Sequence, residues 1–259
     1  MDNRIIESKF INQGYYIFKL DSFFLEKIKL ILINQIRKKT KLDRFNLENF
    51  HKFLPVKKLN SLRLFLYNSL NKDKVFVDSV YSSSENIINN FVGNEIATSN
   101  INLSIQYPND KTSLLKMHTD FFAGESLFQI NLWIPFVDVK KSNSMFIINP
   151  INSIKILNKI RSDKKVTFNM ITKKYKSKIK WLELNYGEAL IFSPNCLHGN
   201  TVNKESTVRW SINVRYKNIY SPYNNIFSNE KKLGNFYKIF KPKIITKFNL
   251  HHNFNEFQD

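Results

Sequence analysis

The chain has 259 residues, of which 42% are hydrophobic and 24% are charged. This composition supports one sizeable core and excludes a disordered, a collagen-like or a small disulfide-rich protein, so we expect a single domain spanning residues 1–259. The formal net charge of +19 favours anionic partners, among them nucleic acid, phosphorylated metabolites and anionic surfaces. Charge alone does not choose among these partners.

The cysteine content and the apolar segments indicate where the protein works. A single cysteine, Cys196, excludes an internal disulfide, and the first ten residues lack the basic and then apolar pattern of a signal peptide. The most apolar segment, residues 23–36, is interrupted by charged side chains and is too polar to span a bilayer. We therefore expect a cytoplasmic protein with no membrane span.

Residues 1–99 are predicted to form a mainly helical scaffold. A short strand is expected over 14–20, followed by an Asp-Ser start signal and a helix that ends at about residue 39. Two more helices are predicted over 59–71 and 84–93. The second of them is opened by the capping residue Ser84 and closed near Gly93. No reactive cluster is evident in this half.

Residues 100–220 show a different pattern, in which short apolar or alternating runs are separated by Pro, Gly, Asn and Asp. Such runs predict β-structure. A lysine-rich stretch at 155–180 is expected to be an insertion between strands, with its charges mainly in solvent. The tail, 221–259, is rich in Asn, Lys and Phe and is expected to pack loosely or to form a partner surface.

Three residues of the β-rich half have metal-ligand character. His118 and Asp120 are two positions apart, so in a strand they point to the same side, and a later strand can bring His198 to the same place. Two imidazoles and one carboxylate on one face of an octahedral metal leave the opposite positions open, which suits non-haem Fe(II) and oxygen chemistry. Because this set is complete, Cys196 is predicted to be a loop residue and not a ligand.

A lone His-x-Asp is weak evidence, but the segment RWSINVRY at 209–216 strengthens it. Strand alternation places Arg209, Ser211, Asn213 and Arg215 on one face, which is too polar for a packed core and suits the interior of a site. A guanidinium on that face can hold a carboxylate through two parallel hydrogen bonds, as a dicarboxylate cosubstrate requires.

The region from Ser104 to Lys217 resembles the Fe(II)/2-oxoglutarate-dependent oxygenases, specifically the phytanoyl-CoA-dioxygenase-like group that includes enzymes of carbohydrate and secondary-metabolite clusters. The resemblance is carried by HTD at 118–120, QINLWIPFVDV at 129–139, NSMFIINP at 143–150, YGEALIFSPNCLHGN at 186–200 and RWSINVRY at 209–216. It implies a mainly β core with flanking helices, namely a double-stranded β-helix (jelly-roll, cupin-like) over 100–220 with the helical scaffold outside it.

The same resemblance implies roles for individual residues. His118, Asp120 and His198 would hold the iron, and Arg209 would hold the side carboxylate of 2-oxoglutarate. Asp120 favours hydroxylation or a related oxidation, because related halogenases replace this carboxylate with a small residue. The chain departs from the family where INPINSIK at 149–156 replaces a segment that often contains a Gly-Ser-His, and this leaves the substrate subclass open.

Four further residues are predicted to support cosubstrate binding. Asn131 and Gln129 share a strand face and would hydrogen-bond cosubstrate or substrate, the alternative being that they point to solvent. Tyr107 would donate to a carboxylate, the alternative being that it packs with its hydroxyl satisfied. Arg215 faces the same way as Arg209, but the two lie roughly 20 Å apart along a strand, and the shorter offset from His198 favours Arg209 as the anchor.

The predicted function is therefore an Fe(II)- and 2-oxoglutarate-dependent dioxygenase that uses O2 to oxidise a small metabolite. A sugar or a nucleotide-linked or phosphorylated carbohydrate is the expected substrate, in agreement with the positive charge. One alternative is a nucleic-acid oxidative demethylase, since Arg209 and Arg215 have the Arg-x5-Arg spacing of those enzymes. The other is a non-catalytic, basic β-domain that binds nucleic acid and whose histidines are structural.

Overall fold

The computed structural model describes residues 3–162, 170, 174–226 and 230–253. The elements of the first hundred residues are α1 (Asn3–Gln13), β1 (Tyr15–Lys19), α2 (Ser22–Thr40), η1 (Phe50–Lys52), α3 (Val56–Lys72), α4 (Lys74–Ser82), α5 (Glu85–Val92) and β2 (Ile96–Thr98). The remaining elements are β3 (Asn102–Gln106), β4 (Gln129–Pro135), η2 (Lys141–Asn143), β5 (Phe146–Ile147), α6 (Pro150–Ser162), η3 (Lys176–Lys178), β6 (Lys180–Trp181), β7 (Glu188–Phe192), β8 (His198–Gly199), β9 (Arg209–Asn218), β10 (Lys238–Lys241) and α8 (Ile244–Asn253).

The helical layer forms where the capping residues and apolar spacing predict it. The Asp21 carboxylate accepts hydrogen bonds from the backbone N–H groups of Phe23 and Phe24 at the start of α2, and Lys41 ends that helix in the left-handed conformation. Leucine and isoleucine recur every three or four residues along α2 and α3, and these stripes are buried. The predicted helices over 21–39, 59–71 and 84–93 correspond to α2, α3 and α5.

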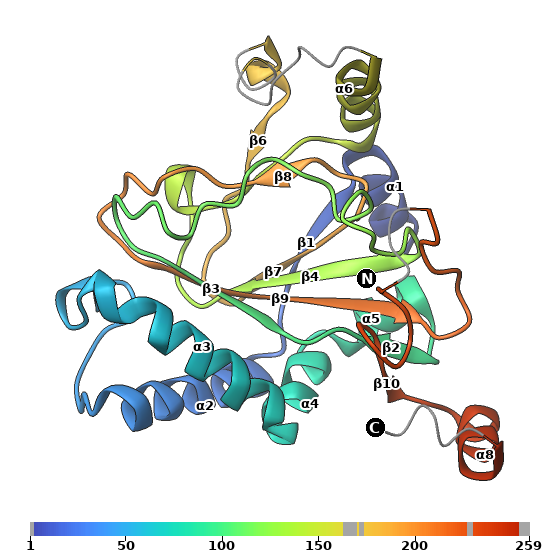
Figure 1. Cartoon of the computed structure of the whole chain (residues 1–259), viewed down its shortest axis with the longest axis horizontal. Coiled ribbons are helices and arrows are strands. Elements are labelled where there is room, and N and C mark those ends of the chain that lie inside the picture. The colour runs from blue at the N-terminus through green and yellow to red at the C-terminus, as the bar shows by residue number, and fades with distance from the viewer. Residues whose placement is uncertain (1–2, 163–169, 171–173, 227–229, 254–259) are drawn as a thin grey trace.

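Two antiparallel sheets form the centre of the protein. The main sheet has the order β1-β7-β4-β9-β2-β10, with β3 also paired to β9, and the small sheet has the order β6-β5-β8. A bridge between His118 and His198 extends the small sheet by one position. Figure 1 shows α2, α3 and α4 on one side of the main sheet and β8 on the other.

The two faces of β9 separate the apolar core from a polar interior. Trp210, Ile212, Val214 and Tyr216 are buried in the core cluster that also contains the stripes of α2 and α3. Residues of the opposite face line a cavity, and these are Arg209, Ser211, Asn213 and Arg215. The alternation predicted for this strand is therefore confirmed.

Both ends of the chain contribute to the main sheet. β1 pairs with β7, and β10 of the tail pairs with β2. The expectation that the tail packs loosely is wrong for this part, because Tyr237, directly before β10, is completely buried. The physical reason is that β2 offers an unpaired edge that β10 covers.

The lysine-rich stretch at 155–180 lies between β5 and β6, as expected of an insertion. Its first part belongs to α6, whose Ile156 is buried against the small sheet, whereas residues 163–169 and 171–173 lie outside the described residues. Among the helices that the structure describes, none is long and apolar enough to cross a bilayer.

Candidate metal centre

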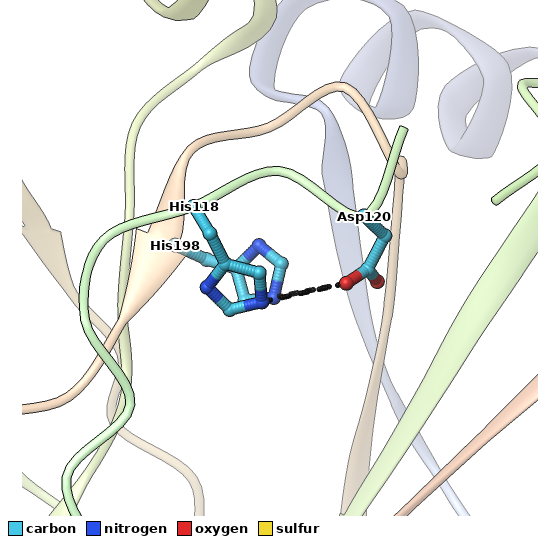
Figure 2. Close-up of side chains that lie close together, drawn as sticks. All are labelled: His118, Asp120 and His198. Carbon is cyan, nitrogen blue, oxygen red and sulfur yellow. Dashed lines mark ion pairs between the residues drawn. The ribbon is translucent and has the colours of Figure 1, made fainter. Parts of the chain in front are cut away.

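His118, Asp120 and His198 converge on one point (Figure 2). The backbones of the two histidines are paired, since each N–H donates to the carbonyl of the other at 2.9–3.0 Å. The Nε2 atoms of His118 and His198 lie 3.4 and 3.9 Å from Oδ1 of Asp120. One nitrogen or oxygen from each of the three residues lies within 4.8 Å of the others, which is close enough for all of them to bind one ion.

The other ring nitrogen of each histidine is held by the backbone. Nδ1 of His118 lies 2.9 Å from the carbonyl oxygen of Lys116, and Nδ1 of His198 lies 2.9 Å from that of Cys196. A carbonyl only accepts hydrogen bonds, so in the neutral rings Nδ1 carries the proton and Nε2 presents a lone pair toward Asp120. Backbone orientation of this kind is typical of metal-binding histidines.

The electrostatics give two of these side chains the charge states that a divalent cation requires. Burial lowers the pKa of His198 to about 4 and keeps its ring neutral. Burial also acts to raise the pKa of Asp120, but Arg215 and the two histidines outweigh it and hold that pKa well below its usual range. At neutral pH the site therefore offers an ionised carboxylate beside a neutral imidazole.

Asn131 and Arg215 hold the carboxylate of Asp120. Asn131 Nδ2 donates to Oδ2 at 2.6 Å, and Arg215 Nη2 lies 3.5 Å from Oδ1. Gln129 Nε2 donates to Asn131 Oδ1 at 3.0 Å. Asn131 and Gln129 are buried, so the alternative that they point to solvent is wrong. Their described hydrogen bonds support Asp120.

A cavity of about 490 Å³ opens beside the two histidines. Its described lining residues include Arg63, Arg209 and Arg215 and no Asp or Glu. Amide and hydroxyl side chains make up most of the remaining polar lining, namely Asn60, Asn102, Ser104, Thr112, Ser113, Asn200, Ser211 and Asn213. The described lining therefore carries arginine charge, of which Arg63 is ion-paired with Asp110 and Arg215 with Asp120 and Glu125.

Arg209 is buried in this cavity without an acidic partner among the described residues. Its Nη1 donates to the carbonyl of Ser144 at 3.2 Å and its Nη2 to Oγ of Ser104 at 3.1 Å. Among the described residues, its Nε and the hydroxyls of Ser144 and Ser211 have no hydrogen-bond partner. Burial lowers the pKa of Arg209 to about 10, so the guanidinium remains charged at neutral pH.

Tyr107 lies elsewhere, which corrects the prediction that it donates to a cosubstrate carboxylate. Its hydroxyl donates to the carbonyl of Leu54 at 3.0 Å, and its ring packs on Phe50 in the helical layer. The cause is strand alternation itself, because Ile105 of β3 pairs with Trp210 on the core face of β9 and Tyr107, two residues further on, joins the same core cluster.

Cys196 is confirmed as a loop residue ahead of β8. It is buried, and its thiol contacts the carbonyl of Gly14. Burial raises the pKa of this thiol to about 12, which keeps it protonated. The metal-ligand cluster that the described residues form does not include it.

Three residues near Asp120 were not predicted from the sequence. Glu125 forms an ion pair with Arg215, Lys231 forms one with Glu125, and the hydroxyl of Tyr237 donates to Gln129. A buried glutamate five residues after the candidate ligand Asp120 follows no strand or helix period. Lys231 and Tyr237 belong to a tail that shows no sequence signal for this contact.

No family model matches the chain, and no curated protein matches it. Solved structures do. EctD from S. alaskensis in its apoform has a TM-score of 0.57 at 12% identity, over 94% of this chain and 85% of that one. EctD with bound Fe has a TM-score of 0.54 at 14% identity, over 89% and 81% of the two chains.

A third structure is the non-haem, α-ketoglutarate-dependent carbocyclase SnoK from nogalamycin biosynthesis. It has a TM-score of 0.53 at 11% identity, over 89% of this chain and 88% of that one. Identities this low establish similarity of fold alone. With the helices and antiparallel sheets described above, the comparisons show that this chain has the fold of the non-haem iron and 2-oxoglutarate-type oxygenases.

Proposed function

We propose that this protein is an Fe(II)- and 2-oxoglutarate-dependent oxygenase. The observation that carries the proposal is the placement of His118, Asp120 and His198 at a cavity that also contains Arg209, a buried cation with no carboxylate partner among the described residues. One group is suited to a divalent metal and the other to a carboxylate ligand. The two together match a metal-bound dicarboxylate cosubstrate.

The proposal includes the fold subclass. Between residues 102 and 218 the chain passes repeatedly from one sheet to the other, from β3 to the His118 bridge, back to β4, on to β5 and β6, then to β7, β8 and β9. This alternation supports a double-stranded β-helix. The sequence motifs quoted above support the phytanoyl-CoA-dioxygenase-like group within it.

In this proposal His118, Asp120 and His198 hold Fe(II), which when bound would supply the activation of O2 and the oxidative decarboxylation of 2-oxoglutarate to succinate and CO2. Arg209 binds the far carboxylate of 2-oxoglutarate, with the free hydroxyls of Ser144 and Ser211 beside it. The backbone carbonyls at Nδ1 keep the imidazoles oriented, and Asn131 does the same for Asp120.

The apolar part of the lining limits the access of water to the site. Trp133, Met145 and Phe192 line the cavity and are themselves buried. Excluding water from the cavity strengthens the electrostatic interactions inside it. These side chains therefore favour a tight contact between Arg209 and an anionic cosubstrate.

For the substrate we propose a small, anionic or carbohydrate-like metabolite. The described lining residues favour hydroxyl-bearing groups, because several amides and hydroxyls occur among them and acidic residues do not, whereas Arg63 is already ion-paired with Asp110. A volume of about 490 Å³ suits a small molecule. Arg215 is ion-paired with Asp120 and Glu125, so its charge is already used within the protein, and the choice against the nucleic-acid demethylase rests on the size of the cavity.

The test is succinate formation from 2-oxoglutarate with Fe(II) and O2, in the presence of phosphorylated sugars or of methylated single-stranded DNA. The proposal predicts that a phosphorylated small molecule stimulates succinate release and that His198→Ala abolishes it. Stimulation by DNA alone would favour the demethylase. Salt-sensitive DNA binding that is unchanged in His198→Ala, without succinate, would favour the non-catalytic domain.

A further inference from the structure

Glu125 lies in a tight loop that brings its carboxylate close to that of Asp120. The Glu125 N–H donates to the Asp120 carbonyl at 3.0 Å, and Gly124 allows this reversal with a φ of 91°. The Glu125 side chain is only 4% exposed. A carboxylate that is so deeply buried requires charged or hydrogen-bonding partners, and the partners here lie directly behind the candidate metal centre.

Arg215 lies between the two carboxylates and contacts them unequally. Its Nε donates to Glu125 Oε2 at 2.9 Å, a strong charge-assisted bond. Its Nη2 is 3.5 Å from Asp120 Oδ1, a looser contact. Oδ1 is also the oxygen that the Nε2 atoms of both histidines approach, and hence the oxygen that a metal would use.

The remaining contacts fix Glu125 in place. Its Oε2 also accepts from Gln129 Nε2 at 2.7 Å, and its Oε1 accepts from Lys231 Nζ at 3.1 Å. Gln129 is held in turn by Tyr237, whose hydroxyl also accepts the N–H of Ser126 at 3.1 Å. Both carboxylate oxygens of Glu125 are therefore occupied, one of them by a lysine of the tail.

We propose that Glu125 is a positioning residue for the metal centre, and that it acts by holding Arg215 away from Asp120 Oδ1. This inference rests on the proposed function, because it assumes that Asp120 binds a metal. If the charge of Glu125 is removed, Asp120 becomes the single anionic partner of Arg215 among the described residues. The guanidinium then closes the 3.5 Å gap and competes with the metal for that oxygen.

The direct test is Glu125→Gln, which keeps the shape and one hydrogen-bond acceptor but removes the charge. Co(II) is titrated anaerobically into the metal-free full chain and followed by tryptophan fluorescence, since Trp133 lines the cavity. We expect the affinity for Co(II) to fall by about tenfold or more, in the range typical of residues that orient metal ligands.

A matched control is Glu188→Gln on β7. Glu188 accepts a hydrogen bond from the backbone N–H of Asn185 at 2.8 Å and has no described contact with Arg215. The same chemical change there should leave the Co(II) affinity unchanged. Urea unfolding of both variants separates a change in metal affinity from a loss of folded protein.

A double-mutant cycle with Arg215→Met tests whether Glu125 acts through Arg215. If it does, Glu125→Gln has no further effect on Co(II) affinity once Arg215 is methionine. This comparison also stands if Glu125→Gln alone does not fold, because the double variant contains neither charge. An equal loss of affinity in both backgrounds would overturn the inference.

The two proposals fail in different ways. Absence of Co(II) binding by the wild-type chain, or binding that is unchanged in His198→Ala, would contradict the metal site itself. Wild-type binding that depends on His198 but is unchanged in a folded Glu125→Gln variant would leave the metal site standing and overturn the role of Glu125.

Discussion

Arg209 and Arg215 lie on the same face of β9, and both are almost completely buried, at 3% and 8% exposure. Their surroundings are opposite. Arg215 contacts two carboxylates, Asp120 and Glu125, and their charges outweigh burial and raise its pKa. Arg209 has no carboxylate within reach among the described residues, and its Nε has no partner.

This difference distinguishes Arg215, which is paired with protein carboxylates, from Arg209, which has no carboxylate partner among the described residues. A buried cation without an anion lowers the stability of the folded state. Such a residue is therefore expected mainly where binding of an anion is part of the function. At Arg215, the guanidinium is paired with two protein carboxylates, one of them that of the candidate ligand Asp120. At Arg209, a positive charge and the Ser211 hydroxyl, neither with an acidic partner among the described residues, line the cavity, which suits the proposed binding of a carboxylate.

The largest expected effect is at the carboxylate that Arg215 supports. Asp120→Ala removes the one anionic side chain of the described ligand set and should lower metal affinity by at least about a hundredfold and abolish succinate formation. Asp120→Glu shifts the carboxylate by about 1.5 Å and should also lose most turnover.

The control for this prediction is Asp138→Ala, which removes an exposed carboxylate that accepts from the Tyr186 N–H. It should retain both metal affinity and turnover. Wild-type succinate production by a folded Asp120→Ala variant, assayed with excess Fe(II) and 2-oxoglutarate, would show that Asp120 is not needed for oxygen activation.

The two arginines should differ in their effect on the cosubstrate. Arg209→Met removes a charged, two-point contact with a carboxylate and should raise the concentration of 2-oxoglutarate required for half-maximal succinate release by about a hundredfold. Arg215→Met should change this requirement much less, because its described partners are protein carboxylates. The reverse ranking would mean that Arg215 is the anchor.

Their effects on stability should differ in sign. Arg215→Met leaves Asp120 and Glu125 buried without their shared cation and should lower the free energy of unfolding by about 3–5 kcal/mol. Arg209→Met removes an uncompensated buried charge, so without ligand the free energy of unfolding should stay the same or rise by about 1–3 kcal/mol. Urea denaturation of the ligand-free proteins measures both, and a large loss in Arg209→Met would contradict this comparison.

The smallest effect is expected at Cys196, which lies two residues before His198 in sequence yet outside the ligand cluster of the described residues. Cys196→Ala should change Co(II) affinity by no more than about twofold, because the wild-type thiol remains protonated. The wild-type thiol should also react with alkylating reagents only slowly until urea unfolds the chain. A large loss of metal affinity would mean that the sulfur takes part in the site.

The residues that the sequence predicted correctly share short, local patterns. The polar face of β9 follows from strand alternation, which requires only that the segment be a strand. His118 and Asp120 lie close together as predicted, but only His118 is in a β-bridge and Asp120 begins a turn, so the strand assumed for this pair is wrong. Asn131 and Gln129 were also expected on an interior face, and they do lie there, although their described partners are protein groups. Strand alternation predicted toward which face these side chains point, but it did not predict which groups they contact.

The residues that were missed depend on contacts between distant segments. Lys231 lies 106 positions from Glu125, and Tyr237 lies 108 positions from Gln129. These contacts arise because β10 pairs with β2. The two strands are far apart in the sequence, so no turn motif between them predicts the pairing. Tyr107 was misplaced for a different reason, since its side chain lies in the core cluster with Ile105, the residue two positions before it in β3, and the β3–β9 register puts Ile105 opposite Trp210.

If one cavity binds a metal and a dicarboxylate together, anaerobic calorimetric titration of 2-oxoglutarate should detect both ligands at the same site. With Fe(II) present, the wild-type chain should bind one 2-oxoglutarate, and the binding should weaken strongly in Arg209→Met and in His198→Ala. Binding of 2-oxoglutarate to His198→Ala as tightly as to the wild-type chain, or no binding to the wild-type chain with Fe(II), would contradict the account.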